Sequence, residues 1–226
     1  MQAGNMVFDI ATWLIPLVIA IVLHEISHGW VANAFGDPTA RDLGRLSPNP
    51  IRHVDPIGTV GLPLLLAVSG APVFGWAKPV PVVAARMRNP RLHMMLVAVA
   101  GPVTNLLLGF VAVFGLAAAV AAVSPGSAPG AFLLANLENF LVINIFLAVF
   151  NMLPMPPFDG GHVVEGLLPR PLARRYAKIG KYGFLLLILL LVVVPMVWPR
   201  LNIIQWIVVP PVKAVLGFYL GLAGLA

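Results

Sequence analysis

The stretch 20-AIVLHEISHGWVANAF-35 is aliphatic at most positions, yet it contains two histidines and a glutamate. It belongs to an apolar run long enough to cross a bilayer as a helix. Ionisable side chains are rare within such helices, because they lose their hydration there, and by default they mark functional sites. His24, Glu25 and His28 are therefore the first candidates for a site, and another group must stabilise them.

The composition indicates an α-helical polytopic integral membrane protein. The 226 residues are 60% hydrophobic and only 10% charged, against about a quarter charged in soluble domains, and the mean hydropathy is +0.95. The net charge of +6 could suggest a nucleic-acid partner. In a membrane protein, however, basic residues set the orientation through their placement in the loops, so no nucleic-acid partner is expected. The chain has no cysteines, which excludes disulfides and thiolate metal ligands.

Five apolar segments are long enough to cross a bilayer as helices. The first ends at Gly36-Asp37-Pro38, a strong helix stop. It lacks a basic leader and a small-residue cleavage site, so it is expected to be retained. Only Pro199-Arg200 separates the last two segments, which predicts a C-terminal helical hairpin. The predicted spans are 8–35, 92–123, 132–153, 182–198 and 201–220, and the hairpin covers 180–222.

The segment between the first two spans has a different character. "GLPLLLAVSG" at 61–70 is about half a membrane long, so it is expected to enter without crossing, and a full crossing would make six spans. "FGWAKPVPVVAARM" at 74–87 mixes proline with β-branched residues, which predicts a small membrane-embedded extended or β region. Backbone of this kind must be buried in protein or line a wet cavity.

Basic residues alternate between the predicted loops. The segment 36–91 carries seven and 154–181 carries five, whereas 124–131 carries none and 199–201 carries one. Under the positive-inside rule both basic loops face the cytoplasm. The expected location is the cell membrane, with the lipid bilayer as a partner and the N-terminus outside.

His24-Glu25-Ile26-Ser27-His28 forms an H-E-x-x-H pattern. Residues four apart share a helix face, so both imidazoles can hold one cation. Glu25 is rotated from His24 by about 100° and can act on water without being a ligand. Zinc hydrolases with a glutamate general base have this arrangement. A five-residue pattern also arises by chance, and the alternative is packing in a core, but the apolar surroundings favour metal binding.

A catalytic zinc needs a third protein ligand and an open position. The best candidate is Asp159 in 151-NMLPMPPFDGGH-162, because it follows the third span at its cytoplasmic end. His28 lies roughly 10 Å from the cytoplasmic end of its own helix. Taken alone, Asp159 reads as a turn carboxylate before glycine. The histidine motif reverses that interpretation.

Several separated motifs together resemble the site-2 proteases, the intramembrane zinc metalloproteases of peptidase family M50. "HEISHG" is similar to the zinc-binding helix of that family, "GRLSPNPIRHVDPIGT" and "FGWAKPVPV" to its embedded extended region, "AGPVTN" to its middle core helix, and "FNMLPMPPFDGGH" to its Asn-to-Asp-Gly motif. The resemblance covers roughly residues 20–165. It implies one Zn²⁺ per chain on His24, His28 and Asp159, and Glu25 as the catalytic base. It also implies that Asn151 and Asn105 hold substrate or an oxyanion.

The resemblance implies hydrolysis of peptide bonds in or near transmembrane segments of membrane-protein substrates. The expected organisation is one domain over 1–226 with a catalytic core at about 8–168, a minimal form without the PDZ or CBS domains of relatives. Two alternatives remain: a metal-ion transporter, which has no need of Glu25 as a base, and a catalytically silent scaffold. The substrate, the oligomeric state and the roles of His53 and His162 stay open.

Overall fold

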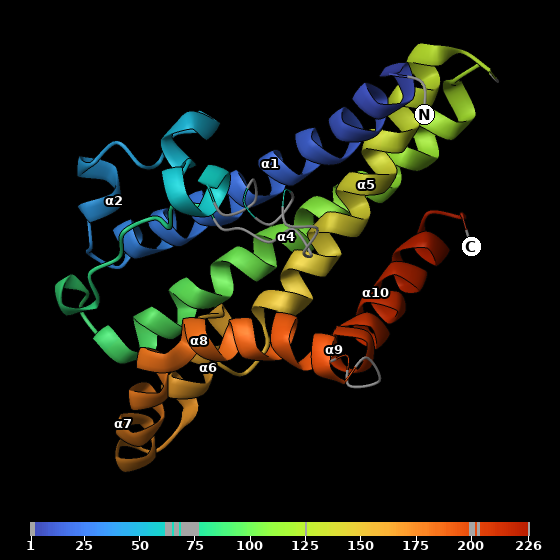
Figure 1. Cartoon of the computed structure of the whole chain (residues 1–226). Coiled ribbons are helices and arrows are strands. Elements are labelled where there is room, and N and C mark those ends of the chain that lie inside the picture. Colours follow the sequence, from blue (N-terminus) through green and yellow to red (C-terminus); the bar gives the residue numbers. More distant parts are fainter. Residues whose placement is uncertain are drawn as a thin grey trace. The chain divides into compact units, whose positions relative to one another are not determined.

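The structure is a computed structural model that describes residues 3–61, 65, 68, 77–124, 126–198, 202 and 204–225. Helices joined by short segments make up this part of the chain (Figure 1). Four helical stretches are long and apolar enough to cross a membrane: Met6–Ala34, Pro90–Ala122, Ala128–Asn151 and Ile204–Leu222. They correspond to four of the five predicted spans, and the protein is a polytopic helical membrane protein as expected.

The remaining predicted span, 182–198, is divided among short helical elements. These are α8 (Gly183–Ile188), the π-helical η5 (Leu189–Val193) and α9 (Val194–Val197). The count of five spans therefore stays a prediction. The element predicted to re-enter at 61–70 lies largely outside the described residues.

The first long helix, α1 (Ala3–Ala34), ends where the sequence predicted. Gly36 has a φ of 109°, which an L side chain rarely adopts. The amide of Gly36 donates to the carbonyl of Asn33 at 3.1 Å, and the amide of Asp37 donates to that of Ala32 at 2.9 Å. These two bonds form a Schellman cap, so glycine supplies the left-handed conformation that ends the helix.

The segment after α1 consists of short elements: α2 (Thr39–Asp42), η1 (Pro50–His53), η2 (Pro56–Gly61) and η3 (Ala84–Arg86). Residues 77–83 run between them without joining a sheet, and the described part of the chain contains no strand. Pro79 and Pro81 lack an N–H group. The amides of Lys78, Val80 and Val83 donate to groups outside any strand. The β region therefore stays a prediction.

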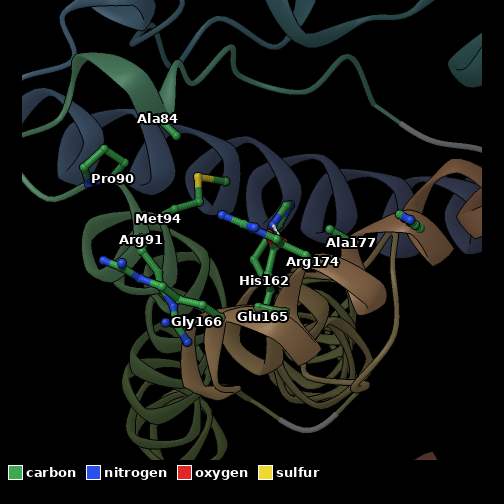
Figure 2. Close-up of a pocket in the computed structure, with 12 residues that line it drawn as sticks. Ala84, Pro90, Arg91, Met94, His162, Glu165, Gly166, Arg174 and Ala177 are labelled. Carbon is green, nitrogen blue, oxygen red and sulfur yellow. Dashed lines mark ion pairs between the residues drawn. The ribbon is translucent and has the colours of Figure 1, made fainter.

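The chain forms two compact units. The unit of Ile21–Gly101 and Met152–Asn202 contains α6 (Asp159–Leu167), α7 (Arg170–Ile179) and η4 (Gly180–Tyr182). Side chains of α6, α7 and the first turn of α4 (Pro90–Ala122) surround a cavity in this unit (Figure 2). The prediction of a single domain over the chain is not decided by this division.

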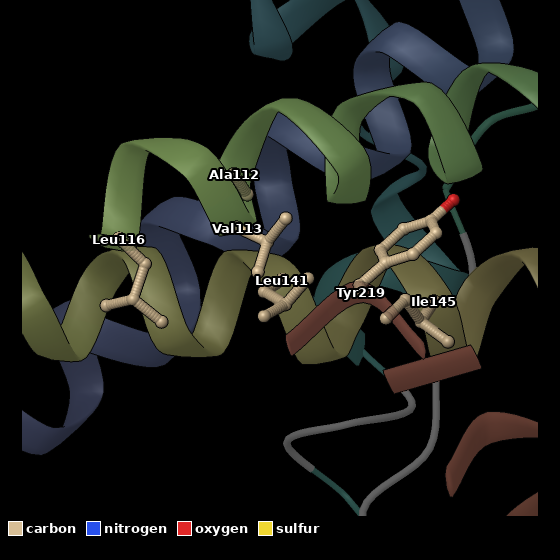
Figure 3. Close-up of a cluster of buried hydrophobic side chains, with 6 residues drawn as sticks. All are labelled: Ala112, Val113, Leu116, Leu141, Ile145 and Tyr219. Atoms are coloured by element: carbon tan, nitrogen blue, oxygen red, sulfur yellow. The ribbon is translucent and has the colours of Figure 1, made fainter. Parts of the chain in front are cut away.

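The other unit comprises Met1–Ala20, Pro102–Asn151 and Ile203–Ala226. Its apolar core joins α4 to α5 (Ala128–Asn151) and α10 (Val209–Leu222), which follows the π-helical η6 (Ile204–Val208). Figure 3 shows the buried members of this core: Ala112, Val113, Leu116, Leu141, Ile145 and Tyr219. The Tyr219 hydroxyl donates to the carbonyl of Leu106 at 3.1 Å, so the polar end of this buried ring is satisfied.

Candidate metal centre

His24 and His28 lie one helical turn apart on α1, and both side chains are buried. Their Nε2 atoms are 3.0 Å apart, as expected for two residues on one helix face. The Nδ1 atom of His28 lies 2.7 Å from the carbonyl oxygen of Val97. Because a carbonyl only accepts, Nδ1 carries the proton and donates. In the neutral imidazole, Nε2 of His28 therefore has the lone pair that a metal requires.

Asp159 opens helix α6 and brings a carboxylate to the same point. Its Oδ2 lies 3.2 Å from Nε2 of His24 and 3.5 Å from Nε2 of His28. A Cβ at Gly160 or Gly161 would lie within 3.0 Å of the backbone of residues 152–156. The two glycines therefore let the start of α6 pack closely against the chain that precedes it, which fixes the position of the carboxylate.

The three side chains form a group whose ligand atoms all lie within 4.8 Å of one another. A tetrahedral zinc with bonds near 2.0–2.2 Å separates its ligand atoms by about 3.3–3.6 Å, and the three observed separations run from 3.0 to 3.5 Å. The buried Oδ2 of Asp159 makes no hydrogen bond. Two imidazole nitrogens and one carboxylate oxygen therefore meet at one point, and each of the three is a ligand type that zinc takes, so the donor set fits zinc.

The charge state of Asp159 suits a metal ligand. Burial alone would raise its pKa, but the neighbouring imidazoles of His24 and His28 lower the pKa to about 2. The group is therefore a carboxylate throughout the physiological pH range and offers a negative ligand atom.

Gly101 on α4 makes room for the imidazoles. A Cβ at this position would lie 2.4 Å from Cε1 of His24 and 2.6 Å from Cε1 of His28. Real Cβ atoms do not approach other atoms this closely, so any side chain here would displace the rings. The "AGP" motif thus has a direct steric function beside the site.

Glu25 is held by a backbone amide from a distant part of the sequence. The N–H of Val80 donates to Oε2 of Glu25 at 2.8 Å. Nη2 of Arg45 donates to the carbonyl of Lys78 at 2.8 Å and to that of Pro79 at 3.3 Å. These bonds anchor the segment that carries the Val80 amide, so the Glu25 carboxylate has a fixed orientation.

His53 and His162, whose roles are open from the sequence, lie outside the metal group. His53 is buried, and its Nε2 lies 2.9 Å from the carbonyl of Ser47, a contact within the loop after α2. Nδ1 of His162 lies 3.8 Å from Oε2 of Glu165 on α6, and both face the cavity of Figure 2.

The two predicted substrate-binding amides belong to the other unit. The Asn105 amide group is fully buried and donates to Oδ1 of Asn144 at 2.8 Å and to the carbonyl of Ala20 at 3.3 Å. The Asn151 amide group donates to the carbonyl of Leu147, one turn earlier on α5, at 3.0 Å. The roles of Asn105 and Asn151 stay predictions.

Sequence reasoning missed the carbonyl of Val97 and the amide of Val80. Both are backbone groups of residues with ordinary apolar side chains, so the sequence has no signal for them. Gly101 had a signal, because a glycine in the interior of an apolar helix costs about 1 kcal/mol relative to alanine. Such a position has a packing or functional reason.

The chain is similar to known proteins over most of its length. The model of "Peptidase family M50" matches residues 12–191. The Bacillus subtilis protein named "Putative zinc metalloprotease YwhC" is 40% identical over 197 residues, which cover 84% of this chain and 85% of the relative. "Putative zinc metalloprotease Rip2" of Mycobacterium tuberculosis strain H37Rv is 34% identical over 194 residues, covering 85% and 69% of the two chains. No solved structure matches the chain.

Proposed function

Because the chain belongs to peptidase family M50, the site-2 protease family, and is a zinc metalloprotease, we propose that it hydrolyses peptide bonds in or near transmembrane segments of membrane proteins. The observation that carries this proposal is the group of His24, His28 and Asp159, in which both histidines are buried and His24 directly precedes Glu25. Both histidines belong to the apolar span Met6–Ala34. Their position supports a membrane-embedded peptide segment as the substrate class.

In this proposal His24, His28 and Asp159 would hold the zinc ion. When bound, zinc acts as a Lewis acid that polarises a carbonyl and makes water more acidic. Glu25 accepts a proton from the water that attacks the peptide carbonyl carbon, and the C–N bond then breaks. Glu25 passes the proton to the departing nitrogen, which leaves a carboxylic acid and an amine as products.

The Val80 amide has a defined role in this mechanism. Its 2.8 Å hydrogen bond to Oε2 of Glu25 leaves the other carboxylate oxygen to exchange protons. A carboxylate that accepts one N–H bond is fixed in direction and keeps acceptor capacity. General-base catalysis depends on this kind of positioning.

We further propose that the protein lies in the cell membrane with the site towards the cytoplasm and the N-terminus outside. The support is the alternation of basic loops, since the segments 36–91 and 154–181 carry 12 of the 14 lysines and arginines. A substrate helix must unwind locally, because its peptide bonds are shielded by helical hydrogen bonds. Asn105 and Asn151 remain candidates for holding the unwound segment or an oxyanion.

The proposal is tested by proteolysis with purified protein in liposomes, using a panel of single-span model substrates. Glu25→Gln is compared with wild type, and the bound zinc is measured in both. The matched control is Glu138→Gln, which makes the same chemical change at an exposed position of α5. We expect Glu25→Gln to lower the cleavage rate by roughly 10²–10⁴-fold with zinc retained, and Glu138→Gln to keep both.

Each alternative function predicts a different result. A metal-ion transporter would move zinc across the liposome membrane and cleave nothing. A silent scaffold would bind substrates without cutting them. Cleavage at the wild-type rate by Glu25→Gln would overturn the assignment of Glu25 as the base.

A further inference from the structure

A second candidate site lies in the same unit as the metal group and shares no residue with it. It is a cavity of about 700 Å³ lined by η3, the first turn of α4, α6 and α7. Figure 2 shows Arg91 and Met94 of α4 near His162 and Glu165 of α6, with Arg174 of α7 beside them. Neither the proposed proteolysis nor the zinc site makes use of this cavity.

The walls of the cavity carry an excess of positive charge. Four side chains with permanent positive charge line it: Arg91, Arg170, Arg174 and Lys178. Glu165 is the only carboxylate among the lining residues, and it lies 3.8 Å from Nδ1 of His162. The lining therefore has a surplus of three positive charges when His162 is neutral, which favours an anion.

The sequence of α7 produces this arrangement. Arg170, Arg174 and Lys178 follow one another at intervals of four, so they form one row along the helix. Ala173 and Ala177 lie beside this row and also line the cavity. Their short side chains leave the space in which the longer basic groups can meet a ligand.

Among the described residues, the three basic side chains of α7 that line the cavity have no partner of opposite charge. Within the part of the chain that the structure describes, none of Arg170, Arg174 and Lys178 forms an ion pair. Arg91 donates through Nη2 to the carbonyl of Leu168, in the turn between α6 and α7. Four like charges around one cavity repel one another, and an anionic ligand would remove that repulsion.

A close helix contact fixes the shape of the cavity. A Cβ at Gly166 of α6 would lie 2.8 Å from the Cβ of Met95 on α4 and 3.0 Å from its Sδ. The absence of a side chain at Gly166 thus allows α6 to lie against α4. The two helices hold Arg91 and Glu165 on neighbouring walls of the cavity. The packing of α6 against α4 therefore fixes the positions of these charged residues.

We propose that this cavity binds a phosphate group, carried by an anionic lipid head group or by a small soluble phosphate. Arginine side chains bind phosphate through two parallel N–H bonds, and a phosphate monoester carries up to two negative charges to match the surplus. Basic pockets at the ends of membrane helices bind lipid head groups in other proteins. Exposed apolar side chains on α6 and α7 (Leu167, Leu172 and Ile179) favour a lipid source.

The proposal is tested by equilibrium binding to the full-length protein in maltoside micelles, which contain no phosphate. The probes are inorganic phosphate, dioleoylphosphatidic acid, and dioleoylglycerol as the lipid without a phosphate. We expect saturable binding of phosphatidic acid at one molecule per chain, and no saturable binding of dioleoylglycerol. The triple variant Arg170→Gln/Arg174→Gln/Lys178→Gln is expected to bind at least about tenfold more weakly.

A matched control removes the same charges outside the cavity. Arg88→Gln/Arg175→Gln/Lys181→Gln also replaces two arginines and one lysine, all exposed and none lining the cavity. Its affinity for phosphatidic acid is expected to change less than about twofold. Equal losses in the two triple variants would show general surface charge attraction and would overturn the proposal.

The probes separate the two possible sources of the phosphate. Binding of phosphatidic acid alone assigns the site to a lipid head group, whereas binding of inorganic phosphate with the same dependence on α7 assigns it to a soluble phosphate. Failure of both probes to bind the wild-type protein overturns the proposal.

A measurement on the wild-type chain guards against a variant that fails to fold. Phenylglyoxal modifies accessible arginines, and mass spectrometry locates the modified sites. We expect the phosphate-bearing probe to slow modification of Arg170 and Arg174 and to leave that of Arg175 unchanged. Equal modification of all three with and without the probe would contradict a site in this cavity.

Discussion

Asp37 and Asp159 are two buried or largely buried carboxylates in one unit of the molecule, and they have opposite hydrogen-bond surroundings. Both belong to short loops or helix starts that follow a membrane-spanning helix. Oδ2 of Asp37 accepts from the amide of Val83 at 2.5 Å, and its Oδ1 accepts from the amide of Thr39 at 3.1 Å and from the Thr39 hydroxyl. Oδ2 of Asp159 is buried without a hydrogen bond, next to two imidazole nitrogens.

The difference separates a structural carboxylate from a ligand carboxylate. Donors of the protein itself satisfy Asp37, so this residue joins the end of α1 to the segment before η3 and needs nothing further. Asp159 lacks such donors and faces groups that can also act as acceptors. A buried charge in that position needs a cation, which is the physical case for zinc at this point.

The largest effect should come from removing the charge at each aspartate in turn. Asp159→Asn is expected to lose most of the bound zinc and to lower cleavage by at least the roughly 10–100-fold seen when an outer partner of a metal ligand is lost. Asp37→Asn is expected to retain one zinc per chain. Metal analysis of the purified variants checks both, and full zinc in Asp159→Asn would contradict its role as a ligand.

The next effect concerns space beside the imidazoles. Gly101→Ala places a Cβ 2.4–2.6 Å from ring atoms of His24 and His28, so zinc affinity should fall roughly 10–100-fold, as it does when ligands lose their orientation. Gly109→Ala is the matched control on the same helix, because its Cβ would meet nothing closer than 3.4 Å. Competition with a chelator measures both affinities. Equal affinities in the two variants would rule out steric contact at Gly101.

Asp37 should also make stability depend on pH. Burial acts to raise its pKa, but the bonds from Thr39 and Val83, helped by Arg86, lower the pKa below the ordinary 3.8. The carboxylate therefore stabilises the fold at all pH values above 3.8, and this contribution is lost as the pH falls below that value through the folded-state pKa. Asp37→Asn should lower stability by about 1–3 kcal/mol near neutral pH, with the difference shrinking in acid.

Unfolding of the detergent-solubilised protein as a function of pH provides the measurement for Asp37. Asp42→Asn is the control, since Asp42 is exposed and pairs with Arg41 at 3.1 Å on the surface. Its effect should stay within about 0.5 kcal/mol. A loss in Asp37→Asn that does not diminish below pH 3.8 would contradict the role of the charge.

The smallest effect is expected at a polar contact that is already satisfied. The 2.8 Å hydrogen bond between Asn105 and Asn144 joins α4 to α5 in the unit that contains Pro102–Asn151. A double-mutant cycle with Asn105→Ala and Asn144→Ala should give a coupling free energy of about 0.6 kcal/mol, typical of hydrogen bonds between membrane helices. Unfolding in a denaturing detergent measures it. A coupling of zero would mean that the bond does not contribute to stability.

The sequence predicted most of the metal group because two features of the sequence are sufficient for it: the spacing of residues along one helix and the apolar character of that helix. The spacing of His24 and His28 places both rings on one face of any helix, and the apolar surroundings identify that helix as membrane-spanning. Asp159 required a second motif, since an Asp-Gly turn looks the same with or without a metal. The bond between Asn105 and Asn144 required the structure, because the two residues belong to different helices.

The sequence by itself determined a helical membrane protein, the end of α1 just before Gly36, and the pair of histidines that face the same way. Only the tertiary structure decided that the Val97 carbonyl orients His28, that the Val80 amide holds Glu25, and that Gly101 leaves room for both rings. The Val97 contact joins residues 69 positions apart, and the Val80 contact joins residues 55 positions apart. Gly101 is more than 70 positions from either histidine. Periodicity describes which side of its own helix a residue faces, whereas contacts between distant elements arise only when those elements pack.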